Sequence, residues 1–140
     1  MKEKEFLSQP FKLDRDIRYK RKLLESMKEH TPCSSMVISD MPRAPHNPKS
    51  SVERAALRVV ELEDEIEEET ERLEELKDEV TSVIRGIGNT ELETLLEMRY
   101  ILFMEWDEIS RSFGYASNNI FRRHREALRR IKVPSAYRSA

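Results

Sequence analysis

Apolar side chains recur every three or four residues in an early stretch of the chain, from Leu13 to Glu29. The stripe consists of Leu13, Ile17, Leu24 and Met27, with Tyr19 and Leu23 beside it and Lys20 in one of its slots. This spacing predicts an amphipathic helix. Its first turn is expected to hold Asp14 and Asp16, because carboxylates interact favourably with the amino end of the helix dipole.

A longer apolar stripe follows a segment between His30 and Ser50 that contains four prolines and is interpreted as a linker. Ser50 or Ser51 can cap the new helix, and no Gly or Pro occurs before Gly86, so the pattern predicts one helix of about 35 residues and about 50 Å. Its apolar positions repeat in heptads, which is typical of a coiled coil. The central members of this seam are Val59, Leu62, Ile66, Leu73, Leu76 and Val80, and Glu69 is its one polar member.

The residues beside the seam are nearly all acidic, and two parallel copies of such a helix would repel each other. The first helix instead carries a basic set, which comprises Arg15, Arg18, Lys20, Arg21, Lys22 and Lys28. We therefore favour an antiparallel hairpin within one chain over a parallel dimer through the long helix alone, and expect Lys20 to meet Glu69. The first helix is only half as long, so part of the seam remains for a second subunit and a homodimer is expected.

Glycines, capping residues and apolar spacing predict three more helices in the last third of the chain. Gly86 and Gly88 end the long helix, and Asn89 or Thr90 can cap the next. A short helix then reaches Gly114, which tolerates the positive φ of a tight turn, and a final helix follows. This is the order of a helix-turn-helix, with a predicted inner face of Ile109, Phe113, Ile120, Leu128 and Ile131 and an outer face of Ser117, Asn118, Arg122, Arg125 and Arg129.

The aromatic side chains of this region are interpreted mainly as core, because a small helical domain needs one. They are Tyr100, Trp106, Phe113 and Phe121. His124, on the final helix, can either touch a phosphate or bond to a neighbouring side chain.

The predicted fold class is all-α: an N-terminal helical hairpin or coiled coil with a long acidic helix, followed by a C-terminal helix-turn-helix. The expected divisions are an N-terminal helix (1–29), a Pro-rich linker (30–50), a coiled-coil helix (51–87), a DNA-binding domain (88–133) and a tail (134–140).

Composition agrees with a helical chain, since 37% of the 140 residues are charged and only three are Gly. The net charge of −2 is unevenly distributed: residues 1–50 carry +4, residues 51–86 carry −8, residues 91–114 carry −4 and residues 115–140 carry +6. A basic end on an acidic spacer is the distribution expected of a nucleic-acid-binding module and its support.

Several classes of protein are not expected. The chain has no apolar run of about 18 residues and no secretory pattern over Met1–Pro10, and its single cysteine, Cys33, fits a reducing cytoplasm. His30, Cys33 and His46 lack the paired spacing of zinc ligands, so neither metal nor cofactor is expected. Asp107 and Glu108 are an acidic pair that could serve as general acid and base, but no nucleophile, phosphate-binding loop or metal cluster accompanies them, so an enzyme is not expected.

The C-terminal motifs resemble a known family. Arg99-Tyr100, Asp107-Glu108-Ile109, Phe113-Gly114 and the closing run from Ala127 to Ile131 are similar to region 4 of sigma-70-type factors. The same region also contains the Arg-Tyr, Trp-Asp-Glu-Ile, Gly-Tyr, Arg-x-His and Glu-Ala-Leu elements, at Arg99, Trp106, Gly114, Arg122 and Glu126. In this arrangement they resemble small phage- and prophage-encoded transcription regulators of the autolysin-regulator and late-gene-activator type, strongly over the last third of the chain and loosely over the rest. The resemblance implies a sequence-specific DNA-binding regulator, with double-stranded DNA as partner and host RNA polymerase as a candidate partner.

Carried over by position, the base-reading residues of the sigma pattern correspond to Ser117, Asn118 and Arg122. Asn118 suits adenine and Arg122 suits guanine in the major groove. Phosphate contacts are assigned to Arg123, Arg125, Arg129, Arg130 and Lys132, although Arg123 stands at an apolar sigma position and can bend back to the bundle instead. The sigma pattern caps this helix with Thr, whereas Ala116 stands here, so the cap is expected to pass to Ser117.

Two alternatives remain at this point. One is a DNA-packaging component, similar to a small terminase subunit, or a replication component. The other is an adaptor that binds RNA polymerase and no DNA.

Overall fold

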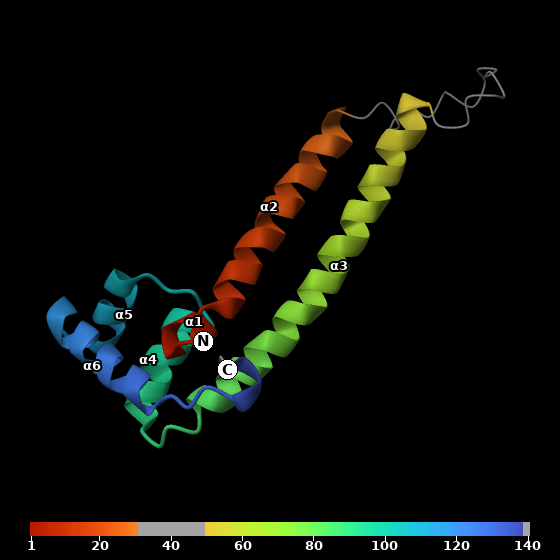
Figure 1. The fold of residues 1–140 in the computed structure, drawn as a ribbon. Helices are drawn as coiled ribbons and strands as arrows, with labels where there is room; N and C mark the ends of the chain where they lie inside the picture. Colours follow the sequence, from red (N-terminus) through yellow and green to blue (C-terminus); the bar gives the residue numbers. More distant parts are fainter. Residues whose placement is uncertain (31–49, 139–140) are drawn as a thin grey trace. The chain divides into compact units, whose positions relative to one another are not determined.

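The computed structural model describes residues 1–30 and 50–138, and its regular elements in these stretches are all helical (Figure 1). They are α1 (Glu3–Leu7), α2 (Gln9–His30), α3 (Ser51–Ile84), α4 (Thr90–Tyr100), α5 (Trp106–Phe113), α6 (Ser117–Arg130) and a short 3-10 turn (Ser135–Tyr137). The predicted all-α class is confirmed. Contacts divide the chain into two units, one of Met1–Asp14 with Arg72–Ala140 and one of Arg15–Glu71.

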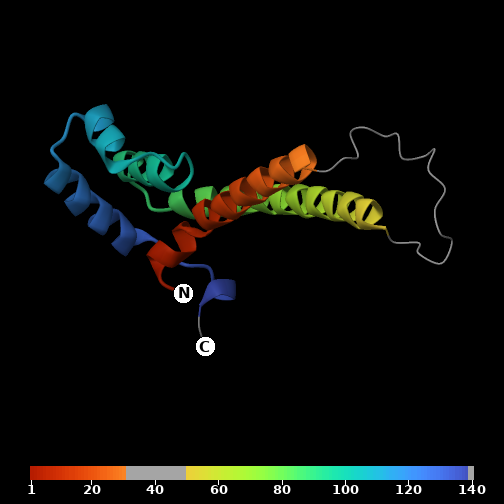
Figure 2. The same cartoon turned by 90° about the horizontal axis from the view of Figure 1, so that it is seen from above.

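Within residues 15–71, α2 and α3 lie side by side and run in opposite directions (Figures 1 and 2). Lys20 binds Glu69 and lies 3.6 Å from Glu65, while Lys28 lies 3.0 Å from Glu63, so higher numbers on α2 meet lower numbers on α3. The hydrogen bond to Glu69 raises the pKa of Lys20. The predicted antiparallel pairing of Lys20 with Glu69 is therefore confirmed.

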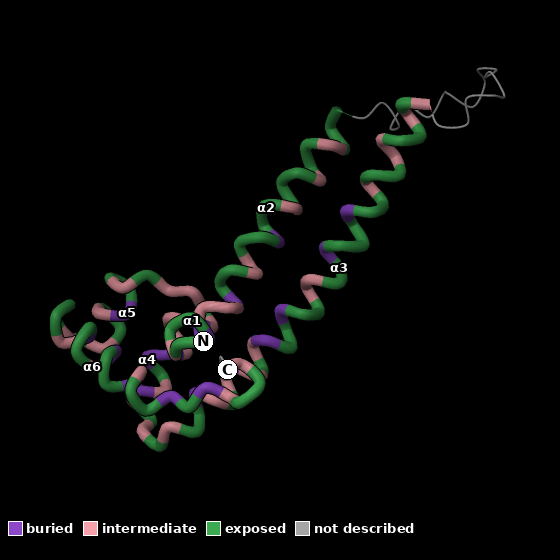
Figure 3. The backbone as a smooth tube through the Cα atoms, viewed as in Figure 1, coloured by how far each residue is buried: buried purple, intermediate pink, exposed green. Residues whose placement is uncertain are grey.

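The apolar interior of this helix pair is narrow. Ile17, Leu62 and Ile66 are its buried apolar side chains, and most other positions of the two helices are exposed or half-buried (Figure 3). Ser50 Oγ accepts a hydrogen bond from the Glu53 amide at 3.2 Å, which confirms one of the two predicted caps of α3.

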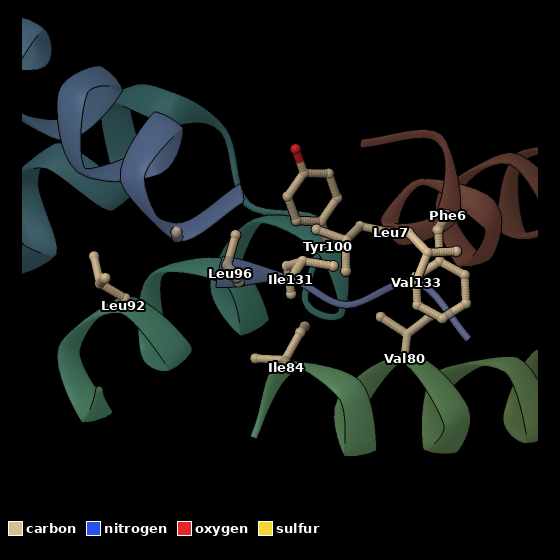
Figure 4. Packing of buried hydrophobic residues seen from close by; sticks show 10 residues of the cluster. Phe6, Leu7, Val80, Ile84, Leu92, Leu96, Tyr100, Ile131 and Val133 are labelled. Atoms are coloured by element: carbon tan, nitrogen blue, oxygen red, sulfur yellow. The ribbon is translucent and has the colours of Figure 1, made fainter. Parts of the chain in front are cut away.

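The other unit has a core built from both ends of its sequence (Figure 4). Its fully or almost fully buried side chains are Phe6, Leu7, Val80, Ile84, Leu92, Leu96, Tyr100, Ala127, Ile131 and Val133. Leu95, Ile109 and Ile120 form a second cluster beneath α5 and α6. The N-terminal residues thus share a core with the last three helices.

The start of the chain differs from the sequence prediction. The predicted first turn at Asp14 and Asp16 is wrong, because α2 already begins at Gln9 and its first turn holds no acidic residue. Pro10 fits there, since the first turn of a helix needs no amide donor at that position. The short helix α1 precedes it and buries Phe6 and Leu7.

Candidate nucleic-acid interface

The last helix, α6, has one buried and one exposed face. Ile120, His124 and Ala127 are buried against the rest of the unit. The predicted outer residues Ser117, Asn118, Arg122, Arg125 and Arg129 are all exposed. Of the predicted inner face, Ile109, Ile120 and Ile131 are buried, whereas Phe113 and Leu128 are half-buried.

The turn before α6 is determined by Gly114. This residue has φ 73° and its amide donates to the Ser110 carbonyl at 2.9 Å, which ends α5. No atom would obstruct a side chain at this position, so the left-handed backbone is what selects glycine. The predicted helix, turn and helix around Gly114 are therefore present.

The amino end of α6 lacks a side-chain cap. The residue at the cap position is Ala116, and Ser117 is already the first helical residue, so the predicted cap at Ser117 is wrong. Asn89, by contrast, caps α4 through a hydrogen bond from the Leu92 amide to its Oδ1 at 3.1 Å. Ala116 and Ser117 are both exposed, so the first amides of α6 face solvent.

Arg123 turns back toward α4. Its guanidinium binds Glu91, lies 4.5 Å from the Tyr115 ring centre and donates from Nε to Asn119 Oδ1 at 3.2 Å. Tyr115 also donates its hydroxyl to Glu91, at 2.9 Å. Of the two predicted directions for the Arg123 side chain, the structure shows the one toward the helical bundle. Glu91 of α4 thus binds both Tyr115 in the turn and Arg123 in α6.

The remaining cations of α6 and its end lie on the surface. Arg122 donates to Asn119 Oδ1 at 3.0 Å, and Arg130 approaches Glu126 at 3.4 Å. Arg125, Arg129 and Lys132 are exposed, and none of them has an acidic partner within residues 1–30 and 50–138. Arg122, Arg125 and Arg129 border one shallow hollow along α6.

His124 belongs to the core. Its Nε2 is 2.7 Å from the hydroxyl of Tyr100, and its ring packs edge-to-face with Trp106 at 4.7 Å. Burial, assisted by the positive charges of Lys4 and Arg99, lowers the pKa of His124 to about 4. Burial likewise raises the pKa of Tyr100 to about 12. His124 is thus a neutral internal partner of Tyr100 and does not face a phosphate.

The aromatic residues do not all lie in the core as predicted. Tyr100 is buried and Trp106 and Phe113 are half-buried, but Phe121 is 39% exposed and packs its ring edge against Trp106 at 5.2 Å. Phe121 therefore adds an apolar surface beside the polar face of α6.

The predicted seam residues belong to two different units. Val59 is half-buried, and Leu62 and Ile66 are buried in the α2–α3 pair. Leu73, Leu76 and Val80 are buried in the other unit, where Val80 is part of the main core. The heptad register continues through Glu69, its one polar member, and did not predict this division.

The structure contains no membrane-spanning candidate and no metal-binding cluster among the residues that it describes. None of the helices there is long and apolar enough to cross a bilayer, and no three His, Cys, Asp or Glu side chains are grouped suitably for a metal ion. His30 contacts the Ser26 carbonyl at 2.8 Å, while Cys33 and His46 lie outside the described residues.

The chain matches a known protein family. A family model described as "Protein of unknown function (DUF1492)" matches residues 49–132. That range is more than half of the chain and includes all of α3, α4, α5 and α6. No curated protein and no solved structure matches the sequence.

Proposed function

We propose that this chain, which belongs to the DUF1492 family, is a DNA-binding transcription regulator that inserts the exposed face of α6 into the major groove. The observation that carries the proposal is the spacing on that face. Asn118, Arg122, Arg125 and Arg129 follow one another at steps of four, three and four residues, and all are exposed. This spacing directs them to one side of a helix opposite the buried Ile120 and Ala127.

The chemistry of this face suits DNA. The amide of Asn118 and the guanidinium of Arg122 can each form two hydrogen bonds to a base edge, as in adenine and guanine recognition. Arg125, Arg129, Arg130 and Lys132 suit phosphates. Arg123 is not among the proposed DNA contacts, because its guanidinium binds Glu91 and packs on the Tyr115 ring.

Two further features support a helix-turn-helix. The order of α5, Gly114 and α6 is the one that this motif requires, and α6 follows as the candidate recognition helix. Its uncapped, exposed amino end leaves amides that can bind a phosphate oxygen. The sequence resemblance to sigma region 4 and to phage-encoded regulators is the reason to place the regulated process in transcription.

We further propose that the regulator acts as a homodimer through the first half of α3. Leu57 and Val60 are about half exposed, at 50% and 51%, although both are large apolar residues. They are three residues apart and so lie on neighbouring parts of one helix surface. Burying them against a second copy removes apolar area from water and brings two copies of α6 to one DNA duplex.

The test begins with selection of bound sequences from random duplex DNA. Equilibrium binding to the selected duplexes is then measured by fluorescence anisotropy. Arg122→Ala is expected to weaken binding to the selected site by about 1 to 3 kcal/mol and to relax preference at one base pair. Arg129→Ala is expected to weaken selected and random duplexes alike. Lys22→Ala, an equal loss of charge in the other unit, is the control and should change neither.

Three results would overturn the proposal in different ways. Equal loss of specific and random binding in Arg122→Ala would reject this placement of the recognition helix. Absence of DNA binding at 50 mM salt, together with binding to RNA polymerase, would favour the adaptor alternative. A ring of about eight or more subunits in analytical ultracentrifugation would favour the packaging alternative, whereas a dimer that Leu57→Asp disrupts supports the assembly proposed above.

A further inference from the structure

A small cavity lies on the unit of α4, α5 and α6, away from the exposed face of α6. Its volume is about 170 Å³, and all its lining residues belong to that one unit. Its walls come from α1, the first turn of α2, the end of α4 and the connection to α5. It is thus built by the N-terminal segment together with the C-terminal helices.

Aromatic rings form much of the wall. Phe11, Tyr100, Phe103 and Trp106 line the cavity, and the rings of Phe11 and Phe103 meet edge-to-face at 5.5 Å. Phe103 has a φ of 58°, a left-handed backbone that is unusual for a bulky residue. Phe103 follows the end of α4, where the amides of Leu102 and Met104 donate to the Glu97 and Met98 carbonyls, both at 2.9 Å, so this left-handed turn ends the helix while the ring packs against Phe11.

Cations accompany the rings. Lys4 and Arg99 line the cavity, with Glu105 as the single acidic residue of the lining. The guanidinium of Arg99 lies 4.6 Å from the Trp106 ring centre and donates to the Met104 carbonyl at 3.0 Å, so it is held in place. The lining therefore combines a fixed guanidinium, a solvent-exposed ammonium and flat apolar surfaces.

The size limits the ligand to one ring. An engineered apolar cavity of about 150 Å³ binds benzene, so a volume slightly larger than this accepts one six-membered ring with a short substituent. Lys4 and Arg99 favour a negative substituent, and a planar guanidinium pairs well with a carboxylate. We infer that this cavity is a binding site for a small aromatic carboxylate, with the ring between the aromatic walls and the carboxylate at Lys4 and Arg99.

Trp106 provides a direct assay. It is the only tryptophan of the chain and it lines the cavity, so its fluorescence reports occupancy without any DNA. Phenylacetate is the probe; phenylacetamide removes the charge, phenethylamine reverses it and acetate removes the ring. Phenylacetate is expected to change the fluorescence saturably with half-saturation in the range of about 0.1 to 1 mM. The neutral amide is expected to bind about tenfold more weakly, and acetate and the amine should not saturate.

Variants separate the cavity from general surface charge. Arg99→Gln and Lys4→Gln are each expected to weaken phenylacetate binding several-fold, whereas Arg111→Gln, an equal change at an exposed residue of the same unit outside the cavity, should leave it unchanged. Because Arg99 also contacts Trp106, circular dichroism and Arg99→Lys, which keeps the charge, distinguish loss of the site from loss of the fold. Equal binding of the acid and the amide, or equal binding by Arg99→Gln and Arg111→Gln in folded protein, would overturn the inference.

Discussion

Replacing Leu7 by Ala tests whether the N-terminal segment is part of the C-terminal module. Leu7 is 0% exposed and belongs to the core that also contains Ile84, Leu96 and Ile131. The sequence alone placed residue 7 outside the expected DNA-binding domain of residues 88–133. The substitution changes no charge and no hydrogen bond, so it measures packing alone.

The expected cost follows from burial. Truncating a fully buried Leu to Ala lowers the free energy of unfolding by about 2 to 5 kcal/mol. For Leu7→Ala we expect about 3 kcal/mol, because α1 has only five residues and can move to fill part of the cavity. The control is Leu102→Ala in the same unit, where the side chain is 65% exposed. Its cost should stay within about 0.5 kcal/mol.

The assay is urea unfolding monitored by the fluorescence of Trp106, which lies in the same unit as Leu7. With a denaturant dependence of about 1.5 kcal/mol per molar, Leu7→Ala should lower the midpoint by about 2 M and Leu102→Ala by a small fraction of this. A fragment of residues 88–140, which lacks Phe6, Leu7, Val80 and Ile84, should be largely unfolded by circular dichroism. Equal midpoints for the two Ala variants, or a folded fragment, would refute the shared core.

Four further expectations concern DNA binding, the turn at Gly114, the pH dependence of stability and the helix pair. DNA affinity measured between 50 and 200 mM salt should fall with a log–log slope of about −3 to −6 per subunit, and a flat response would contradict phosphate binding. Gly114→Ala should lower the free energy of unfolding, measured in urea, by about 1 kcal/mol or more, because the strained φ and not a clash opposes the side chain. Burial lowers the pKa of His124 from 6.5 to about 4, so at acid pH the unfolded chain takes up a proton that the folded chain excludes. This contribution to stability is complete well above pH 6.5, about 2 kcal/mol of it is lost by pH 5, and the loss continues to about pH 4; His124→Gln should abolish the loss in urea titrations. In the helix pair, Lys20→Leu or Glu69→Leu alone leaves the remaining charge without its main partner. The double variant should therefore have a higher melting temperature than either single variant, and strictly additive shifts of the melting temperature would contradict the pairing.

The helix pair was largely predictable because its information is local. Charge of opposite sign on two amphipathic helices, with Lys20 and Glu69 as matching breaks in their apolar stripes, was sufficient to predict an antiparallel arrangement. The exposed face of α6 was predictable for the same reason, since residues three and four apart share a helix face whatever the helix packs against.

The roles of Arg123 and His124 were not predictable in this way. Their spacing allowed an outward or an inward direction, and the choice depends on Glu91 and Tyr100, which precede them by 32 and 24 residues. The uncapped start of α6 is a similar case, because the backbone of the preceding turn decides which residue takes the cap position.

The sequence by itself determined the all-helical class, most helix limits, the turn at Gly114 and the polar face of α6, because periodicity, capping and glycine conformation act between near neighbours. Only the tertiary structure decided that Phe6 and Leu7 complete the C-terminal core, that one heptad seam divides between two units, and that Lys4 and Arg99 share an aromatic cavity. An apolar stripe indicates that one face of a helix is buried, but it does not indicate which surface packs against that face. The partner is chosen by the shape and volume of side chains that are distant in sequence, and that choice exists only in the folded chain.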